Sequence, residues 1–293
     1  MTWLDDLGDS CHKNVPLGPM TWFKLGGPAE YFVTPTSDTR FAQIVKHCRE
    51  SGVPLRILGL GANLLVGDAG VRGVVVQLSA DAFNQTVFDG DRVSAGAGVS
   101  LAKLILATLR KGLAGLEHLA GIPASVGGAI RMNCGGRYGD ISTAVESVRV
   151  IGPNGDIYVR EHDDLDFGYR HCNLGHDIVI SATFKLAQTD PDALHTRFRE
   201  IWMYKQNTQP PMGDHSAGCI FKNPDGKSAG QLIDQAGLKG LRIGGAYVSD
   251  RHANFIMAEA GAKADDVRKL IDAVRERVRA AHSIDLQTEI QIW

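Results

Sequence analysis

Glycine-rich segments are the first places in this chain where backbone could approach a ligand closely. Leu58-Gly59-Leu60-Gly61-Ala62-Asn63-Leu64-Leu65 follows a short apolar run. A dinucleotide-binding fingerprint would need a third glycine at position 64 and a helix after it, but this chain has Leu64 there and a second strand pattern from Val74. Successive backbone amides in such a loop can still form a concave anion site. A diphosphate site and a plain turn between strands both remain open for this motif.

A second segment combines small and apolar residues with very few charges. It reads Ala120-Gly121-Ile122-Pro123-Ala124-Ser125-Val126-Gly127-Gly128-Ala129, and Asn133-Cys134-Gly135-Gly136 follows. Such a surface suits a wall against a flat aromatic ring system, with backbone amides offered to ring nitrogens and carbonyls. A buried, packed turn explains the same pattern equally well.

Metal chemistry finds little support in the residue spacing. His171, Cys172 and His176 are ligand types, but no second cluster accompanies them. The five cysteines are scattered without a Cys-x-x-Cys pair, which indicates free thiols in a reducing compartment. We therefore expect no bound metal and no disulfide framework.

The elements that must position these segments alternate between helix and strand in the first part of the chain. An i, i+3, i+4, i+7 stripe predicts a helix over 39–51, followed by strands at 55–58 and 74–78. Ser100 is expected to cap the next helix with its side chain, and Gly112 to end it. A hairpin is predicted around Pro153-Asn154-Gly155-Asp156, and a further strand near 178–186.

The pattern changes after residue 188. Asp190 and Pro191 start a helix whose buried stripe is expected to comprise Leu194, Phe198, Ile201 and Trp202. A loop over 208–214, a short helix capped by Ser228, a long helix over 264–282 and a last strand over 286–292 follow. These elements predict an α+β protein with a glycine-rich N-terminal region, a smaller domain over about 190–283, and a final strand that returns to the first lobe.

Bulk composition narrows the partners and the compartment. Charged residues make up 22% of the chain and the net charge is −2, so no strong field favours nucleic acid or an acidic membrane. No run approaches the roughly 20 apolar residues that span a bilayer. The stretch from Met1 to Asp9 has no basic region and no apolar core, which argues against a signal peptide. We expect a cytoplasmic protein.

Several motifs, taken in order, resemble one known family. They are Thr21–Ala29 (TWFKLGGPA), Gly59–Leu65, Gly121–Ala129, Phe167–Arg170 (FGYR), Ser216–Pro224 (SAGCIFKNP), His252–Phe255 (HANF) and Thr288–Ile290 (TEI). Their order is similar to that in UDP-N-acetylenolpyruvoylglucosamine reductases, the MurB family, over about residues 20–293. The compact 171–188 segment looks like the family's second structural type, which lacks an extra loop over the substrate.

The resemblance implies a vanillyl-alcohol-oxidase-like FAD fold with two α+β subdomains and a third, substrate-binding domain. It places the subdomains at 1–79 and 80–189, with strand 284–293 returning to the FAD lobe, and the UDP-sugar domain at 190–283. It implies FAD, NADPH as hydride donor, and reduction of UDP-N-acetylglucosamine enolpyruvate to UDP-N-acetylmuramate in peptidoglycan synthesis. The FAD-binding candidates are Leu58, Gly59, Leu60, Gly61, Ala62, Asn63, Leu64, Gly121, Ile122, Pro123, Ser125, Val126, Gly127, Gly128, Asn133 and Gly135.

The resemblance also implies three catalytic residues, whose chemistry suits the reaction. Hydride attack on the enolpyruvyl double bond pushes negative charge onto the carboxylate, and Arg170 can bind that carboxylate with two parallel bonds. Glu289 matches the family's glutamate and is compatible with a carboxylate if it is protonated or shares a hydrogen bond or water. Cys219 stands where commonly described members have a proton-donating serine. With a reference pKa of about 8.5, a thiol can donate the same proton.

The remaining candidates would hold the substrate. They are Tyr169, Lys205, Lys222, Asn223, Lys239, His252 and Asn254. Lys205 and Lys239 are candidates for the UDP diphosphate. Thr208 stands where many members have a lysine, and the role of that lysine either passes to Lys205 or is absent. His252 and Asn254 could line the sugar site, and a structural capping role is equally compatible with both.

Two other functions remain open at this point. One is another FAD-dependent oxidoreductase of the same fold, such as an alcohol or hydroxy-acid oxidase. The other is an inactive UDP-sugar-binding homologue, for which the Cys219 departure is the reason. We expect a monomer with a small-molecule substrate, no nucleic acid and no membrane insertion.

Overall fold

The computed structural model describes Trp3 and residues 10–293. Of residues 1–9, for which the sequence argues against a signal peptide, only Trp3 is among the described residues. The chain folds into two compact units. Among the described residues, the first comprises those up to 13, 31–60 and 73–204, and the second comprises 14–30, 61–72 and 205–293. Within the described residues, no helix is long and apolar enough to cross a bilayer.

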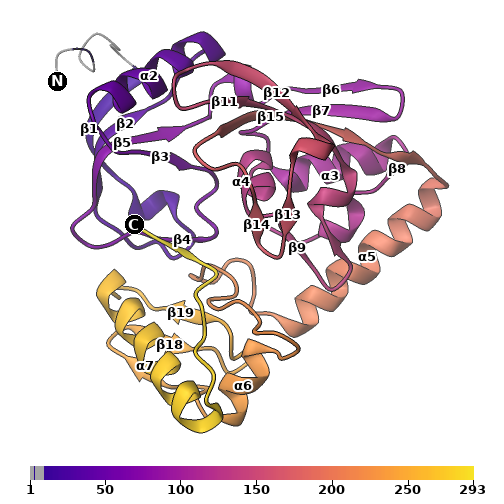
Figure 1. The fold of residues 1–293 in the computed structure, drawn as a ribbon. Helices are drawn as coiled ribbons and strands as arrows, with labels where there is room; N and C mark the ends of the chain where they lie inside the picture. The colour runs from indigo at the N-terminus through magenta and orange to yellow at the C-terminus, as the bar shows by residue number, and fades with distance from the viewer. Residues whose placement is uncertain (1–2, 4–9) are drawn as a thin grey trace. The chain divides into compact units, whose positions relative to one another are not determined.

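A five-stranded antiparallel sheet forms the centre of the first unit, in the order β12-β11-β15-β7-β6 (Figure 1). Its strands are β6 (Thr86–Asp89), β7 (Arg92–Gly96), β11 (Val145–Ile151), β12 (Ile157–Glu161) and β15 (Ile178–Lys185). Ile151 pairs with Ile157, so the predicted hairpin around 153–156 is confirmed. Helices α3 (Leu101–Arg110) and α4 (Val126–Arg131) contribute buried residues to the core beside this sheet.

A second sheet has the order β1-β2-β5-β3. Its strands are β1 (Cys11–Pro16), β2 (Pro28–Val33), β3 (Leu55–Leu58) and β5 (Val71–Gln77), and β3 runs parallel to β5. Helix α2 (Asp38–Glu50) begins at Ser37, whose side chain accepts the Arg40 amide, and buries Phe41, Ile44 and Cys48. The helix expected over 39–51 and the strand expected over 55–58 are confirmed, and the strand expected over 74–78 is β5, which begins three residues earlier.

One expectation about the helices is confirmed only in part, and another is wrong. Ser100 is the N-cap residue of α3, but its side chain makes no cap hydrogen bond. In α5 (Pro191–Thr208), Leu194 and Ile201 are buried, whereas Trp202 is 36% exposed and Phe198 is only half-buried. The helical period of the stripe was predicted correctly. Leu194 and Ile201 are fully buried and Phe198 packs against the core while half-buried, so the buried face of the helix is narrower than the pattern suggests.

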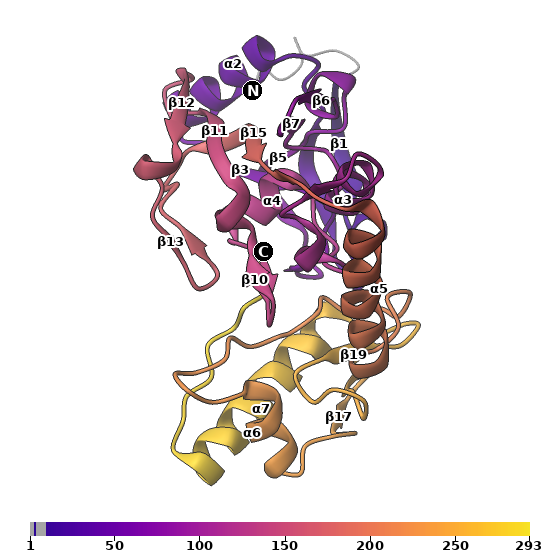
Figure 2. The same ribbon diagram turned by 90° about the vertical axis from the view of Figure 1, so that its right-hand side faces the viewer.

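The second unit is built on a small antiparallel sheet in the order β17-β18-β19, which comprises β17 (Arg242–Ile243), β18 (Ala246–Val248) and β19 (Ile256–Ala258). Helix α7 (Ala264–His282) packs on β17 and β18 and contacts α6 (Ala229–Gln235) (Figure 2). The predicted cap of α6 is confirmed, since the Ser228 hydroxyl accepts the Gln231 amide. The core of this unit includes Val267, Leu270 and Val274 of α7.

The C-terminal strand is much shorter than expected. Only β20 (Gln291–Ile292) is regular, and it runs parallel to β4 (Leu64–Leu65) at the end of the glycine loop. Residues before it make an isolated bridge, Phe221 to Thr288, instead of a continuous ladder. The predicted strand over 286–292 is therefore wrong in length, and the three-part domain division stays a prediction.

Candidate active site

The two glycine-rich segments meet at Gly59. A Cβ atom on Gly59 would lie 2.6 Å from the Ser125 Oγ, so the first loop passes directly over the start of α4. Gly61 has a φ of +65°, and a Cβ there would lie 2.3 Å from the Met20 carbonyl oxygen. The Trp22 amide donates to the Gly61 carbonyl at 3.0 Å. Both glycines are therefore needed for contacts within the protein, and their presence alone does not identify a ligand.

The second segment is a capped helix, which the sequence did not predict. Ser125 is the N-cap of α4, and its side chain accepts the Gly128 amide at 3.3 Å. The Val126 amide donates to Val99, and the Gly127 amide to Ala97, at 2.8 and 2.9 Å. These two amides are therefore engaged within the protein, and the expectation that other amides of the segment face a ring stays a prediction. A serine before a run of small and apolar residues was the available signal for this helix start.

The remaining surface of this segment fits a flat aromatic cofactor through apolar contact. Ile122 and Pro123 are half-buried, Leu60 is 37% exposed, and Gly121 has a φ of +75° that turns the backbone sharply. The segment from 121 to 124 contains no charged side chain. Contact of these residues with FAD stays a prediction, now through side chains and the loop before α4.

Arg170 lies at the tip of a small hairpin formed by β13 (Phe167–Gly168) and β14 (His171–Cys172). Its φ is +55°, a left-handed conformation that is uncommon outside glycine. Its Nη2 donates to the Gly135 carbonyl at 2.9 Å, and its guanidinium carbon lies 5.0 Å from the centre of the Tyr169 ring. Tyr169 itself is 52% exposed. The hairpin therefore presents an arginine and a tyrosine together.

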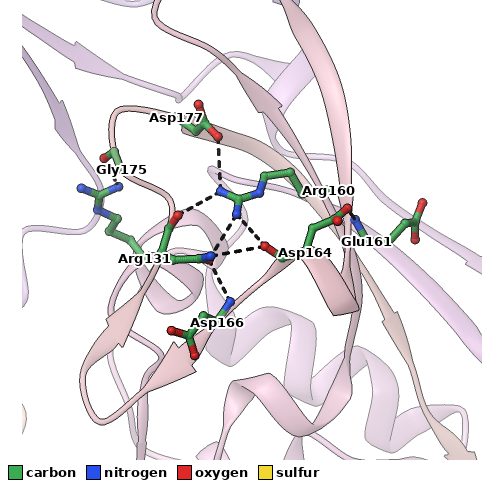
Figure 3. A network of polar contacts seen from close by, with 8 residues as sticks. Arg131, Arg160, Glu161, Asp164, Asp166, Gly175 and Asp177 are labelled. Carbon is green, nitrogen blue, oxygen red and sulfur yellow. Dashed lines mark hydrogen bonds and ion pairs between the residues drawn. The ribbon is translucent and has the colours of Figure 1, made fainter.

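A polar network fixes the base of this hairpin (Figure 3). Arg160 donates to the Asp164 carbonyl at 2.6 Å and to the Asn173 carbonyl at 3.0 Å, and it pairs with Asp177 at 3.3 Å. The Asn173 side chain in turn accepts the Asp166 amide at 2.8 Å. Arg160 and Asp177 have side chains only 16% and 13% exposed, so this ion pair is screened less than a surface pair. The network joins both strands that lead to Arg170.

Cys219 and Glu289 lie on neighbouring segments of the second unit. The Glu289 amide donates to the Ile220 carbonyl at 2.7 Å, and the Ile220 amide donates to the Asn254 carbonyl at 2.8 Å. Cys219 also forms an isolated bridge with Phe255. Segment 219–222 therefore lies between 252–255 on one side and 287–289 on the other. The segments that carry Cys219 and Glu289 are therefore adjacent, and both residues are partly exposed.

Asn63, a residue predicted to bind FAD, holds the segment that carries Glu289. Its Nδ2 donates to the Glu289 carbonyl at 3.3 Å, and its own carbonyl accepts the Gln291 amide at 3.0 Å. These partners are 226 positions apart in the chain, so no local pattern could have revealed the contact.

The predicted substrate residues divide into two groups. Asn254 is 3% exposed, and its side chain bonds to both the amide and the carbonyl of Phe221 at 3.0 and 2.8 Å. The His252 ring accepts the Asn254 amide at 3.2 Å, and burial lowers the pKa of His252 below its ordinary value, with Lys239 as a smaller cause. For these two residues the structure favours the capping role.

The other group is more exposed. Asn223 accepts the Ala229 amide at the start of α6, and Lys239 pairs with Asp234 at 2.8 Å. Lys222 is half-buried, and Lys205 lies in the last turn of α5. A diphosphate at Lys239 would have to compete with Asp234.

One cavity was not predicted. It has a volume of about 340 Å³, lies in the first unit and is lined by Glu117, His118, Tyr138 and Arg197, among others. Glu117 is 3% exposed, accepts the Gly115 amide at 2.7 Å and pairs with Arg197 at 3.2 Å. Among the described residues, no group of three or more His, Cys, Asp or Glu side chains could hold a metal ion.

Comparison with known proteins decides the family. The family model "UDP-N-acetylenolpyruvoylglucosamine reductase, C-terminal domain" matches residues 209–293, and an FAD binding domain model matches residues 29–159. The reductase of that name from Heliobacterium modesticaldum is 44% identical over 283 residues, which cover 96% of this chain and 90% of the relative. The chain belongs to this family.

Other relatives agree over the same length. The UDP-N-acetylenolpyruvoylglucosamine reductase of Moorella thermoacetica is 41% identical over 281 residues, which cover 96% of this chain and 92% of the relative. The crystal structure of the enzyme from Thermus caldophilus is similar with a TM-score of 0.85 and 38% identity, covering 96% of this chain and 98% of that one. The α+β fold with an FAD-binding domain and the family membership, both predicted from the sequence, are confirmed. The individual site residues stay predictions.

Proposed function

We propose that this protein is an FAD-dependent reductase that converts UDP-N-acetylglucosamine enolpyruvate to UDP-N-acetylmuramate, with NADPH as the hydride donor. The observation that carries the proposal is that Cys219 and Glu289 lie on adjacent hydrogen-bonded segments in a chain of this family. A proton donor and a carboxyl group at one place are what addition across an enolpyruvyl double bond requires. The protein acts as a monomer in the cytoplasm, in peptidoglycan synthesis, and has no nucleic-acid partner.

Residues near the two glycine-rich segments, including Gly59, Gly121, Ile122 and Pro123, would hold FAD. When bound, FAD would supply the hydride, which comes from NADPH. The amides of Val126 and Gly127 are engaged within the protein, so segment 121–124 would contribute to FAD binding through apolar contact and by excluding water.

Arg170 binds the substrate carboxylate. As hydride reaches the terminal carbon, negative charge grows on that carboxylate, and a guanidinium fixed in advance stabilises it without reorganisation. The Gly135 carbonyl, which accepts from Nη2, and the Tyr169 ring, 5.0 Å away, fix the orientation of the guanidinium.

Cys219 then donates its thiol proton to the carbon that bears the carboxylate, and the thiolate is reprotonated from solvent. Glu289 orients the substrate carboxylate or a water beside it through a shared hydrogen bond. Tyr169, Lys205, Lys222, Asn223 and Lys239 grip the nucleotide sugar, Lys205 and Lys239 at the diphosphate.

An absorption experiment tests the proposal directly. The purified protein should show a flavin spectrum that bleaches anaerobically with NADPH and recovers when the enolpyruvyl nucleotide is added. Oxygen consumption with simple alcohols, without such recovery, would indicate an oxidase of the same fold. A colourless protein that takes up no FAD would indicate an inactive UDP-sugar-binding homologue.

Two variants of Cys219 test the proton donor. Cys219→Ser should keep measurable turnover, whereas Cys219→Ala should lose about 10²-fold or more in reduction of the enolpyruvyl group while NADPH still bleaches the flavin. Stopped-flow traces of the two half-reactions separate these effects. Full turnover by Cys219→Ala would refute the assignment.

A further inference from the structure

Asn133 has a buried side chain that is used at both ends. It is 3% exposed, its Nδ2 donates to the Gly168 carbonyl at 3.0 Å, and its Oδ1 accepts the Ser142 amide at 3.3 Å. Its φ of +38° lies in the left-handed region, which asparagine tolerates better than most residues. An amide that donates to one backbone group and accepts from another cannot be replaced by a residue with only one of these functions.

The same short segment grips the Arg170 hairpin at a second point. Gly135 accepts the Arg170 Nη2 at 2.9 Å, two residues after Asn133, and Gly168 lies two residues before Arg170. Two hydrogen bonds therefore join segments 133–135 and 168–170: the Asn133 side chain donates to the Gly168 carbonyl, and the Arg170 side chain donates to the Gly135 carbonyl. Because Arg170 is also left-handed, a small change at Gly168 would change the direction of its side chain.

The hairpin does not depend on this contact for its existence. Its base is held by Arg160, which bonds to Asp164, Asn173 and Asp177 (Figure 3). Strands β13 and β14 also pair through Phe167 and Cys172. Loss of the Asn133 amide should therefore leave the hairpin folded and loosen only its tip.

We propose that Asn133 is a positioning residue for Arg170: its amide sets the turn at Gly168 and so aims the guanidinium at the substrate carboxylate. This inference rests on the proposed function, because it needs a substrate with a carboxylate at Arg170. It changes the role that the family resemblance implied for Asn133, which was contact with FAD.

The test compares Asn133→Gly with Asn84→Gly. Glycine keeps the left-handed backbone accessible at position 133 and removes only the amide. Asn84 is a control in the same unit, since its Nδ2 also donates to backbone carbonyls, those of Leu78 and Ala80 at 2.9 and 3.0 Å, although Asn84 is exposed and its φ is −120°. Asn133→Gly should slow flavin reoxidation by the enolpyruvyl nucleotide by about 10- to 100-fold and leave flavin content and bleaching by NADPH unchanged. Asn84→Gly should change neither half-reaction.

Ligand binding gives a readout independent of turnover. In calorimetry on the FAD-loaded protein, Asn133→Gly should weaken binding of UDP-N-acetylmuramate, which has a carboxylate, by about 10-fold. It should change binding of UDP-N-acetylglucosamine, which has none, by less than about twofold. In a protein that already carries Arg170→Ala, Asn133→Gly should change the rate of flavin reoxidation and the affinity for UDP-N-acetylmuramate by less than about threefold further. The guanidinium that Asn133 positions is then already gone.

Several results would overturn the inference. One is loss of bound flavin in Asn133→Gly. Another is an equal loss of affinity for UDP-N-acetylmuramate and UDP-N-acetylglucosamine. A third is a double variant whose fold-effect equals the product of the effects of Asn133→Gly and Arg170→Ala. If Asn133→Gly does not fold, Asn133→Asp replaces it, since aspartate tolerates the backbone, still accepts the Ser142 amide, and loses the donor to Gly168 when ionised. Failure of the wild-type protein to reoxidise with the enolpyruvyl nucleotide is a different outcome, and it refutes the proposed function itself.

Discussion

The buried amide of Asn254 offers the sharpest test of the second unit. It bonds in both directions to the backbone of Phe221, and Phe221 itself is 1% exposed. Asn254→Ala removes both bonds. The amide and the carbonyl of Phe221 are then left buried without these partners.

The size of the effect follows from those two groups. Each buried backbone group left unsatisfied costs about 1–3 kcal/mol, so the free energy of unfolding should fall by about 2–6 kcal/mol. A loss near the middle of that range, about 4 kcal/mol, corresponds to a fall of roughly 10 °C in the melting temperature. Because segment 219–222 carries Cys219, the same change should slow reduction of the enolpyruvyl group.

Thermal and denaturant unfolding measure the fall in the free energy of unfolding, and two further variants test its cause. Asn223→Ala removes an amide next to the same stretch, but Asn223 is exposed and accepts the Ala229 amide at the start of α6. We expect it to cost about 1 kcal/mol. Asn254→Asp can donate to the Phe221 carbonyl only when protonated, so its deficit relative to wild type should shrink as the pH falls. An Asn254→Ala protein of wild-type stability that no longer binds the nucleotide sugar would refute the structural role.

Three further predictions concern single residues. Gly59→Ala should release part of the bound flavin, because its Cβ would lie 2.6 Å from the Ser125 Oγ, and adding Ser125→Ala should restore flavin content measured by absorbance. The pKa of His252 is lowered in the folded state, so the unfolded chain binds the extra proton, and stability should fall as the pH drops below about 6.5. Denaturant titrations should show a smaller fall in His252→Gln, and an unchanged slope would contradict it. Burial raises the pKa of Cys48 to about 12, so iodoacetamide at about pH 8 should modify the partly exposed Cys219 and leave Cys48 intact, as peptide mass mapping would show.

Local patterns were enough to predict much of the architecture. The apolar stripes of α2 and α7, the proline that begins α5, the Ser228 cap of α6 and the turn at 153–156 depend on residues a few positions apart. Helix period and turn chemistry act within that distance, so the sequence reveals them. The order of motifs along the chain also identified the family correctly.

Local patterns failed where burial or a distant partner decides the outcome. The periodicity of α5 could not show that Trp202 stays at the surface, and the apolar pattern before β20 could not show that it pairs only at Gln291–Ile292. In the same way, the glycines at 59 and 61 suggested a ligand, whereas the atoms that exclude a side chain there belong to Ser125 and Met20.

What the sequence by itself determined was the set of chemical groups, namely an arginine, a thiol, a carboxyl group and two glycine-rich segments, together with the elements that carry them. Tertiary structure alone decided which amides hold those groups: Asn133 at the Arg170 hairpin, Asn63 at Glu289 and Asn254 at the Cys219 segment. A side-chain amide bonds to whichever backbone group the fold brings within about 3 Å, and that partner has no fixed spacing along the chain.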